Sequence, residues 1–349
     1  PTCSRRCGPC SSSSASAEPG PARPVTGASA TLAPMRACRT LLALTAVVAA
    51  AGACVHAAVP ESLPEPTTTT LEAAAPPAEE PDCGDPVASL RPTGPATTEV
   101  PPDSYMAEIQ RRGHLRVGTD VATMQLSSVD PQTGEFEGFD VDIAREVAAA
   151  LFGDPDRIVF VGIPSSDRVA ALVEGRVDLV ASTFTPTCGR RQDIEFSTDY
   201  YTSKQQVLLP RSAPARTVED LAARRICASA GTTPLANLAE LPGVEPVPAA
   251  ERADCLVMMQ RGEADGMSTN DTILVGFAAQ DPTLHIVRVD ISTEPTALGL
   301  PKGHPEWVRY VNAVLEDVRA SGRWQELYDT WLADLLGPSD GPPEPTYVD

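Results

Sequence analysis

GFDVDIAREVAAAL, residues 138–151, is the stretch that decides the fold. After the opening glycine, apolar residues recur at the spacing that places one stripe along a helix. These residues are Ile143, Val147 and Leu151. The runs LRVG at 115–118 and IVFV at 158–161 lie on either side and predict short strands. Strands that alternate with helices favour a parallel sheet with helices packed against it.

The same alternation continues from 105 to 335, and one phrase occurs twice. VEGRVD at 173–178 and MQRGEAD at 259–265 each predict a helix that ends at glycine, followed by Asp and a strand. The repetition predicts two lobes built on one plan. In open α/β sheets ligands bind beyond the carboxyl ends of the strands. Polar loops at such ends are expected at 119–124, 162–168, 182–190, 229–233 and 268–271.

Length and charge limit the classes of function. The chain has 349 residues, which suits two globular domains with tails. Its 27 Lys and Arg against 47 Asp and Glu give a formal charge of −20. Such a chain repels nucleic acid and anionic lipid, so neither is an expected partner. An anionic ligand would need a few local arginines and backbone N–H groups to hold it.

The cysteine and histidine positions do not predict a metal site or an enzyme. None of the nine cysteines forms a CxxC…CxxC pattern, and the four histidines show no HExxH spacing. No Ser/His/Asp or Cys/His set occurs in a suitable context. We therefore expect no catalytic residue, no metal and no cofactor.

The N-terminal residues predict export. Residues 1–34 lack an initiating Met and are interpreted as an upstream extension, and 35–53 as a signal peptide with a short apolar run. Ala51-Gly52-Ala53-Cys54 looks like a lipobox, so Cys54 is the expected lipidation site. Ordinary cleavage near Ala57 or Ala58 is the alternative. Either route leads to a compartment where disulfides persist.

Two segments are expected to lie outside the folded body. Residues 54–104, after the lipidated cysteine, are rich in Pro, Thr, Ala and Glu and predict a stiff linker. Residues 336–349 predict a Pro-rich tail. The protein is then expected as a monomer on the extracytoplasmic face of the cell membrane, held through its lipid only.

The run 138–143, together with Val147, Ala148 and Leu151, resembles the signature of the bacterial family 3 extracellular solute-binding proteins. The resemblance covers roughly 105–335. Segments 82–86, 88–92 and 346–349 resemble the actinobacterial glutamate- and glutamine-binding lipoproteins of that family. The family resemblance implies an α/β periplasmic-binding-protein fold of type II, the Venus flytrap. Lobe 1 would be 105–207 plus 297–335, and lobe 2 would be 208–296, joined by a two-strand hinge.

The resemblance also implies a site for a free amino acid, whose buried charges all need partners. Thr185 and Arg190 match the loop in which Arg holds the ligand's α-carboxylate with two hydrogen bonds. Asp271 matches the acceptor of the α-ammonium, completed by backbone atoms near Thr183. Thr232 and Thr233, where a loop enters a helix, offer N–H groups to an anion.

The residues expected around the ligand's side chain favour two different ligands. Ser165 and Arg168 resemble the Ser-x-x-Arg of glutamate and aspartate binders, where Arg meets the ligand's distal carboxylate. Asp120 stands where a glutamine binder uses Asp to accept an amide N–H. We therefore expect L-glutamate or L-aspartate, with Gln or Asn as the alternative.

Partners and disulfides complete the expectations. The implied function is delivery of the amino acid to the permease of an ABC importer. The alternatives are a sensor that signals through a membrane receptor to a Ser/Thr kinase and, third, a dehydratase-type enzyme. Cys227–Cys255 matches a disulfide of the glutamate-binding relatives. Cys83–Cys188 would fasten the linker to the loop that carries Arg190.

Overall fold

The computed structural model describes residues 81–213 and 215–348. The expected extension 1–34, the signal peptide 35–53 and the lipidation site Cys54 lie outside these residues. Within the described part, no helix is long and apolar enough to cross a membrane.

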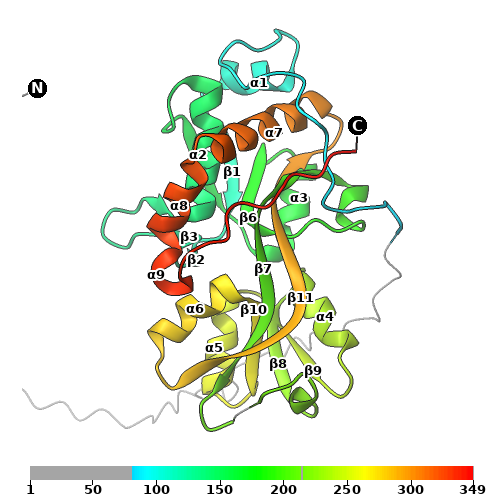
Figure 1. Ribbon diagram of the computed structural model, residues 1–349, viewed down its shortest axis with the longest axis vertical. Coiled ribbons are helices and arrows are strands. Elements are labelled where there is room, and N and C mark those ends of the chain that lie inside the picture. The colour runs from blue at the N-terminus through cyan, green and yellow to red at the C-terminus, as the bar shows by residue number, and fades with distance from the viewer. Residues whose placement is uncertain (1–80, 214, 349) are drawn as a thin grey trace, which may run out of the picture. The chain divides into compact units, whose positions relative to one another are not determined.

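Lobe 1, in the upper half of Figure 1, has parallel strands covered by helices. β5 (Ile158–Gly162), β1 (Leu115–Thr119) and β6 (Leu179–Phe184) are neighbours and run parallel. A small antiparallel sheet of β2 (Ala122–Thr123), β3 (Ser127–Val129) and β4 (Phe136–Glu137) adjoins them. The helices are α1 (Tyr105–Arg112), α2 (Phe139–Phe152), α3 (Arg168–Val173), α7 (Pro305–Ala320), α8 (Arg323–Trp331) and α9 (Ala333–Leu336).

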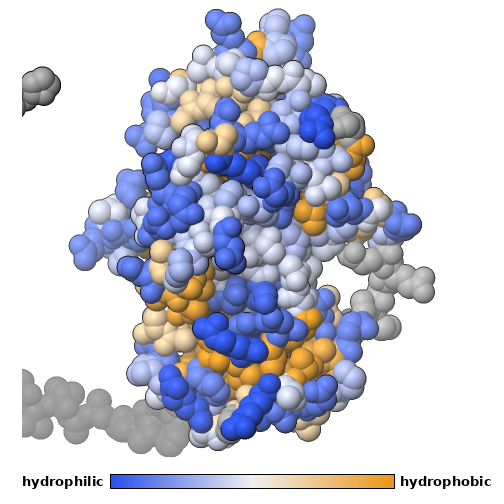
Figure 2. Space-filling view, viewed as in Figure 1, coloured by the Kyte–Doolittle hydropathy of each residue, from blue (hydrophilic) through white to orange (hydrophobic). Residues whose placement is uncertain are grey.

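Lobe 2, in the lower half, follows the same plan. β10 (Gly266–Asn270), β8 (Arg225–Ser229) and β9 (Glu245–Ala249) are parallel neighbours. Its helical elements are the short η3 (Glu219–Leu221), α4 (Thr233–Glu240), α5 (Arg252–Gln260) and α6 (Asp271–Gln280). On the face drawn in Figure 2, hydrophobic residues gather over this lobe, while lobe 1 is mainly hydrophilic.

Two long strands join the lobes. β7 (Ile194–Pro210) and β11 (Leu284–Pro301) pair antiparallel and pass through both halves of an eight-stranded sheet of order β5-β1-β6-β11-β7-β10-β8-β9. Their register shifts between the two halves. The expected lobe boundaries, 207/208 and 296/297, fall inside these two strands, so the predicted two-strand hinge and two-lobed α/β fold are confirmed.

Gly138 shows why the deciding stretch begins with glycine. Its φ is +130°, and a Cβ atom there would stand 2.4 Å from the backbone of Leu126. No side chain fits that approach. α2 can therefore start directly against the small sheet, with Ile143, Val147 and Leu151 fully buried behind it.

The aromatic residues of the C-terminal helices pack in the core of lobe 1. Trp307 is fully buried and donates to the Asp178 carbonyl at 3.1 Å. Trp324 is 2% exposed and donates to the Tyr200 carbonyl at 2.6 Å. A buried indole N–H normally finds such an acceptor. Trp324 thus holds α8 to the hinge strand β7, and Trp307 holds α7 to Asp178, which directly precedes β6.

Parts of the expected linker and tail pack against the body, which differs from the sequence expectation. Ser89 and Tyr347 form a β-bridge, and Arg91 lies over the Tyr347 ring at 4.4 Å. The Tyr347 hydroxyl donates to Glu316 on α7 at 2.7 Å. Residues 82–92, which we call the strap, therefore lie with the tail along lobe 1. The composition of these segments did not predict their packing against lobe 1, because it depends on a few specific contacts that have no periodic pattern in the sequence.

Candidate ligand-binding site

A small cavity lies between the lobes, where loops after their strands meet. Its volume is about 10 Å³, room for about one water molecule. Six residues expected from the sequence line it: Arg168, Thr183, Thr185, Arg190, Thr232 and Thr233. Four residues that were not named as ligand-binding residues complete the lining, although two of them lie in the expected loop 268–271: Pro234, Arg252, Thr269 and Asn270. The cleft is thus closed, and an amino acid can enter only when the lobes separate.

Arg190 spans the two lobes. It begins the short helix η2 (Arg190–Gln192) of lobe 1, and its Nη1 donates to the Thr185 carbonyl. Its Nη2 donates to the Gly231 carbonyl of lobe 2 at 2.8 Å. The guanidinium also lies 4.8 Å from the centre of the Phe184 ring. The head group is therefore oriented at the cavity wall before any ligand arrives.

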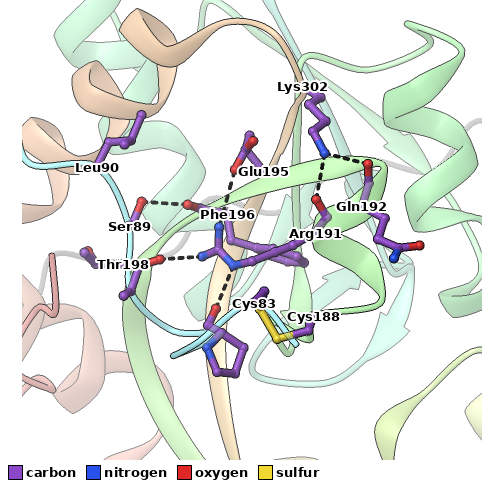
Figure 3. A network of polar contacts seen from close by, with 12 residues as sticks. Cys83, Ser89, Leu90, Cys188, Arg191, Gln192, Glu195, Phe196, Thr198 and Lys302 are labelled. Atoms are coloured by element: carbon purple, nitrogen blue, oxygen red, sulfur yellow. Dashed lines mark hydrogen bonds and ion pairs between the residues drawn. A yellow bond between two sulfur atoms is a disulfide. The ribbon is translucent and has the colours of Figure 1, made fainter. Parts of the chain in front are cut away.

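The strap is attached to the segment around Arg190 through Cys188 and Arg191, which Figure 3 shows. The structure joins Cys83 to Cys188, the expected pair, with Cα atoms 5.4 Å apart. Arg191 donates to the strap carbonyls of Pro86 and Ala88 at 2.8 and 2.7 Å. Burial lowers the pKa of Arg191, and Glu195 opposes this shift. A disulfide and the half-buried Arg191 thus fix the segment that presents Arg190.

Two of the three guanidinium nitrogens of Arg168 donate hydrogen bonds to the cavity wall. It is 2% exposed, and its Nε donates to the Ser165 carbonyl at 2.8 Å. Its Nη1 donates to the carbonyls of Ser182 at 2.9 Å and Thr183 at 3.3 Å. Burial lowers the pKa of Arg168 well below its usual range, and nearby Arg190 and Arg252 lower it further. Ser165 itself does not line the cavity; its contribution is this carbonyl.

Thr183 has a left-handed backbone, with φ of +42°, which is uncommon for a β-branched residue. Three contacts hold it there. Its N–H donates to Asp140 at 2.7 Å, its carbonyl accepts from Arg168, and its hydroxyl accepts from Arg252 at 3.0 Å. Such conformations persist where neighbours over-determine them, often at ligand sites.

Asp140 anchors this corner from the deciding stretch itself. It is 1% exposed and accepts from the Tyr200 hydroxyl at 2.7 Å as well as from Thr183. Burial raises the pKa of Asp140 to about 6, although both hydrogen bonds oppose that shift. The carboxyl that shapes the cavity therefore titrates in a mildly acidic range.

Asp120 lies behind the cavity and faces Arg252. Its Oδ2 accepts from Arg252 Nη1 at 2.8 Å, and its Oδ1 accepts from the Thr123 hydroxyl at 3.0 Å. Both charged side chains are 7% exposed. The pair connects α5 of lobe 2 to the loop after β1 of lobe 1.

The structure brings Asn270, and not Asp271, to the cavity. Asn270 ends β10, and its Nδ2 donates to the Ser203 hydroxyl at 2.6 Å. Asp271 begins α6 and accepts from the backbone N–H of Lys204 at 3.3 Å and of Thr272 at 2.8 Å. Burial raises the pKa of Asp271. Asp271 was expected to accept from the ligand's α-ammonium, but its side chain does not line the cavity.

Glu294, on the hinge strand β11, is a buried carboxylate that sequence reasoning missed. It is 1% exposed and accepts the hydroxyl protons of Thr185, at 2.8 Å, and Thr233. Ser292 and Asn237 donate to its other oxygen at 2.6 and 3.2 Å. A hydroxyl has one proton, so both threonines, which line the cavity, keep lone pairs that can accept a hydrogen bond.

Thr232 caps α4. Its side chain accepts from the Leu235 N–H at 3.4 Å and donates to the Ser229 carbonyl at 2.6 Å. The first turn of α4, at Thr232 to Pro234, faces the cavity, so the positive end of its dipole adds to the three guanidiniums.

The second expected disulfide is also present. Cys227 on β8 is joined to Cys255 on α5, with Cα atoms 5.5 Å apart. Cys255 lies three residues after Arg252, and Asp254 accepts from the N–H of Glu251 at 3.0 Å. The start of α5, and with it Arg252, is therefore held to the sheet of lobe 2.

Comparison with known proteins gives one family. The model of "Bacterial extracellular solute-binding proteins, family 3" matches residues 115–334. The ABC transporter glutamine-binding protein GlnH of Bacillus subtilis is 27% identical over 243 residues, which are 69% of this chain and 89% of that protein. The glutamate-binding protein GluB of Corynebacterium glutamicum is 29% identical over 248 residues, covering 67% and 82%.

A solved structure agrees with these relatives. The crystal structure of the ancestral amino acid-binding protein AncCDT-1, described as a precursor of cyclohexadienyl dehydratase, superposes with a TM-score of 0.60. It is 30% identical and covers 65% of this chain and 99% of that one. The likeness therefore includes both lobes and the hinge.

Proposed function

Since the chain belongs to the bacterial extracellular solute-binding proteins, family 3, we propose that it captures L-glutamate or L-aspartate between its lobes. The protein would close on the amino acid outside the cytoplasm and deliver it to the permease of an ABC importer. The names of its relatives, which refer to glutamine, glutamate and an ABC transporter, support this class of protein.

One observation carries the choice of an acidic ligand. Three guanidiniums, those of Arg168, Arg190 and Arg252, converge on one small cavity, and none of its ten described lining residues is acidic. An acidic amino acid brings two carboxylates, and Arg is the side chain that best matches their geometry. A neutral amide would leave one of these charges without an anionic partner.

Arg190 is the proposed clamp for the α-carboxylate. The α-ammonium would find the amide oxygen of Asn270 and the hydroxyl lone pairs of Thr185 and Thr233, with Asp271 adding negative charge from behind the wall. Asp120 is already paired with Arg252, which argues against its use as an acceptor for a ligand amide.

We do not propose turnover. AncCDT-1 is described as the precursor of an enzyme, so an assay with arogenate and a panel of amino acids is the appropriate check. The cleft would serve a sensor as well as an importer, and the ABC transporter named among the relatives favours the importer. Attachment to the membrane through lipidated Cys54 is part of the proposal, and mass spectrometry of membrane fractions tests it.

A thermal-shift screen tests the ligand class. A ligand at 100 times its Kd stabilises the folded state by about 2.7 kcal/mol, which raises the unfolding temperature measurably. We expect Glu and Asp to give the largest shifts among the common amino acids. A larger shift with arginine, or with a sugar only, would contradict the proposal.

A further inference from the structure

Arg252 reaches from lobe 2 across the closed cleft and lines the cavity. It is 6% exposed, yet its side-chain hydrogen bonds within the described residues go to lobe 1: Nη1 donates to Asp120 and Thr123, both at 2.8 Å, and Nη2 donates to Thr183 at 3.0 Å. Its guanidinium therefore occupies the space between the lobes as a ligand group would.

One donor of Arg252 has no hydrogen-bond partner among the described residues. Among the described residues, its Nε–H is one of the few buried side-chain polar atoms without a hydrogen-bond acceptor. Buried donors are rarely left unpaired, and a donor on a charged group is especially costly to leave so. The unsatisfied edge belongs to a side chain that lines the cavity, which indicates an acceptor that arrives with the ligand.

A carboxylate is the acceptor that suits this edge. Nε and one Nη of a guanidinium form a parallel pair of donors that matches the two oxygens of a carboxylate. A side-chain amide offers one oxygen and would satisfy only one of the two donors. The acidic side chain of the ligand can therefore satisfy both, whereas glutamine or asparagine cannot.

In the closed, ligand-free cleft, Asp120 is the carboxylate that accepts a hydrogen bond from Arg252. Arg252 and Asp120 belong to different lobes, so their contact must break when the cleft opens to admit an amino acid. We propose that Arg252 is a specificity-determining residue that exchanges Asp120 for the ligand's distal carboxylate, with the Arg252–Asp120 pair as the resting latch of the cleft. This inference rests on the proposed function and refines it, because it assigns recognition of the ligand's acidic side chain to Arg252 of lobe 2.

The test is calorimetric titration of the full protein and its variants with L-Glu, L-Asp, L-Gln and L-Asn. For Arg252→Gln we expect about 100-fold weaker binding of the acids and less than about 5-fold weaker binding of the amides. For Asp120→Asn we expect acids to bind about 5-fold more tightly, because the competing carboxylate is gone. Arg261→Gln, on the exposed end of the same helix, is the matched control and should change nothing.

An acid-to-amide ratio that is unchanged in Arg252→Gln would overturn the inference, because a simple strut between lobes affects all four ligands alike. Weaker binding of all ligands to Asp120→Asn would also count against it. If Arg252→Gln does not fold, Arg252→Lys keeps the charge without the paired donors and should still lower the ratio about 10-fold. If the wild-type protein binds none of the four ligands, the proposed function itself fails; if it binds Glu and every variant keeps its selectivity, only the latch fails.

Discussion

Gly231 in lobe 2 lies so close to Ser166 in lobe 1 that a Cβ atom on Gly231 would stand 2.7 Å from the Ser166 Cα atom. The φ of Gly231 is +70°, and its carbonyl accepts from Arg190 of lobe 1. The backbone of one lobe thus lies against the backbone of the other next to Arg190, which lines the cavity. Closure at this point requires a residue without a side chain.

Gly231→Ala should therefore hold the cleft partly open. We expect about 10-fold or more weaker binding of every amino-acid ligand, because the contacts of both lobes can no longer form together. Gly175→Ala is the control: its φ is +65°, but no atom lies within 4 Å of the added Cβ. It should cost about 1–2 kcal/mol of stability and leave affinity unchanged. Equal affinities in the two variants would show that this contact does not limit closure.

Arg190→Ala should weaken all amino-acid ligands alike. Every one of them carries the α-carboxylate, and removing one partner of a buried charge pair costs about 2–5 kcal/mol. Calorimetry compares the affinities of the variant for an acid and for its amide. Arg157→Ala is the control, because the Arg157 side chain is 59% exposed. A loss of affinity confined to Glu and Asp would show that Arg190 binds the ligand's side-chain carboxylate rather than its α-carboxylate.

Replacing Cys83 and Cys188 by serine should affect both stability and binding. The bond closes a sequence separation of 105 residues, and loop-closure entropy predicts a loss of roughly 3–5 kcal/mol. The loop that carries Arg190 also loses its covalent support, so affinity should fall. Urea unfolding and calorimetry measure the two effects. A loss of stability with unchanged affinity would mean that Arg191 alone holds the loop in place.

Asp140 should make stability fall as pH rises from about 4 to about 6. Its folded-state pKa is raised to about 6 from the usual 3.8, so the unfolded chain releases this proton first. The difference corresponds to about 3 kcal/mol, present at low pH and lost above the folded pKa. The stability of the wild type relative to Asp140→Asn should decrease across this window. A difference that stays constant with pH would contradict the raised pKa.

The helix expected at 139–151, observed as Phe139–Phe152, and the alternating strands could be predicted from the sequence because their burial is periodic. The hinge strands were underestimated, because only 206–209 of β7 and 296–300 of β11 were expected as strands. The polar side chains of Ser203, Gln205 and Gln206 are buried by hydrogen bonds rather than by apolar contacts. The lobe plan was predictable, and the full length of the crossing strands was not.

In the site, the loop residues of lobe 1 were the predictable part, because they stand within a recognisable spacing. Arg252 and Glu294 were missed because each reaches the site only through the fold, one from the start of a helix and the other from the middle of a hinge strand. Asn270 and Asp271 show the limit of such inference. Of these two neighbours only Asn270 lines the cavity, and the spacing of the sequence could not distinguish them.

Calorimetric titration of the purified protein with L-glutamate, followed by L-aspartate, L-glutamine and L-arginine, tests the central claim most directly. The three guanidiniums at the cavity predict a Kd for Glu or Asp in the micromolar range or tighter, roughly −8 kcal/mol, with weaker binding of Gln. Tighter binding of arginine, or no heat of binding with either acid, would contradict the claim.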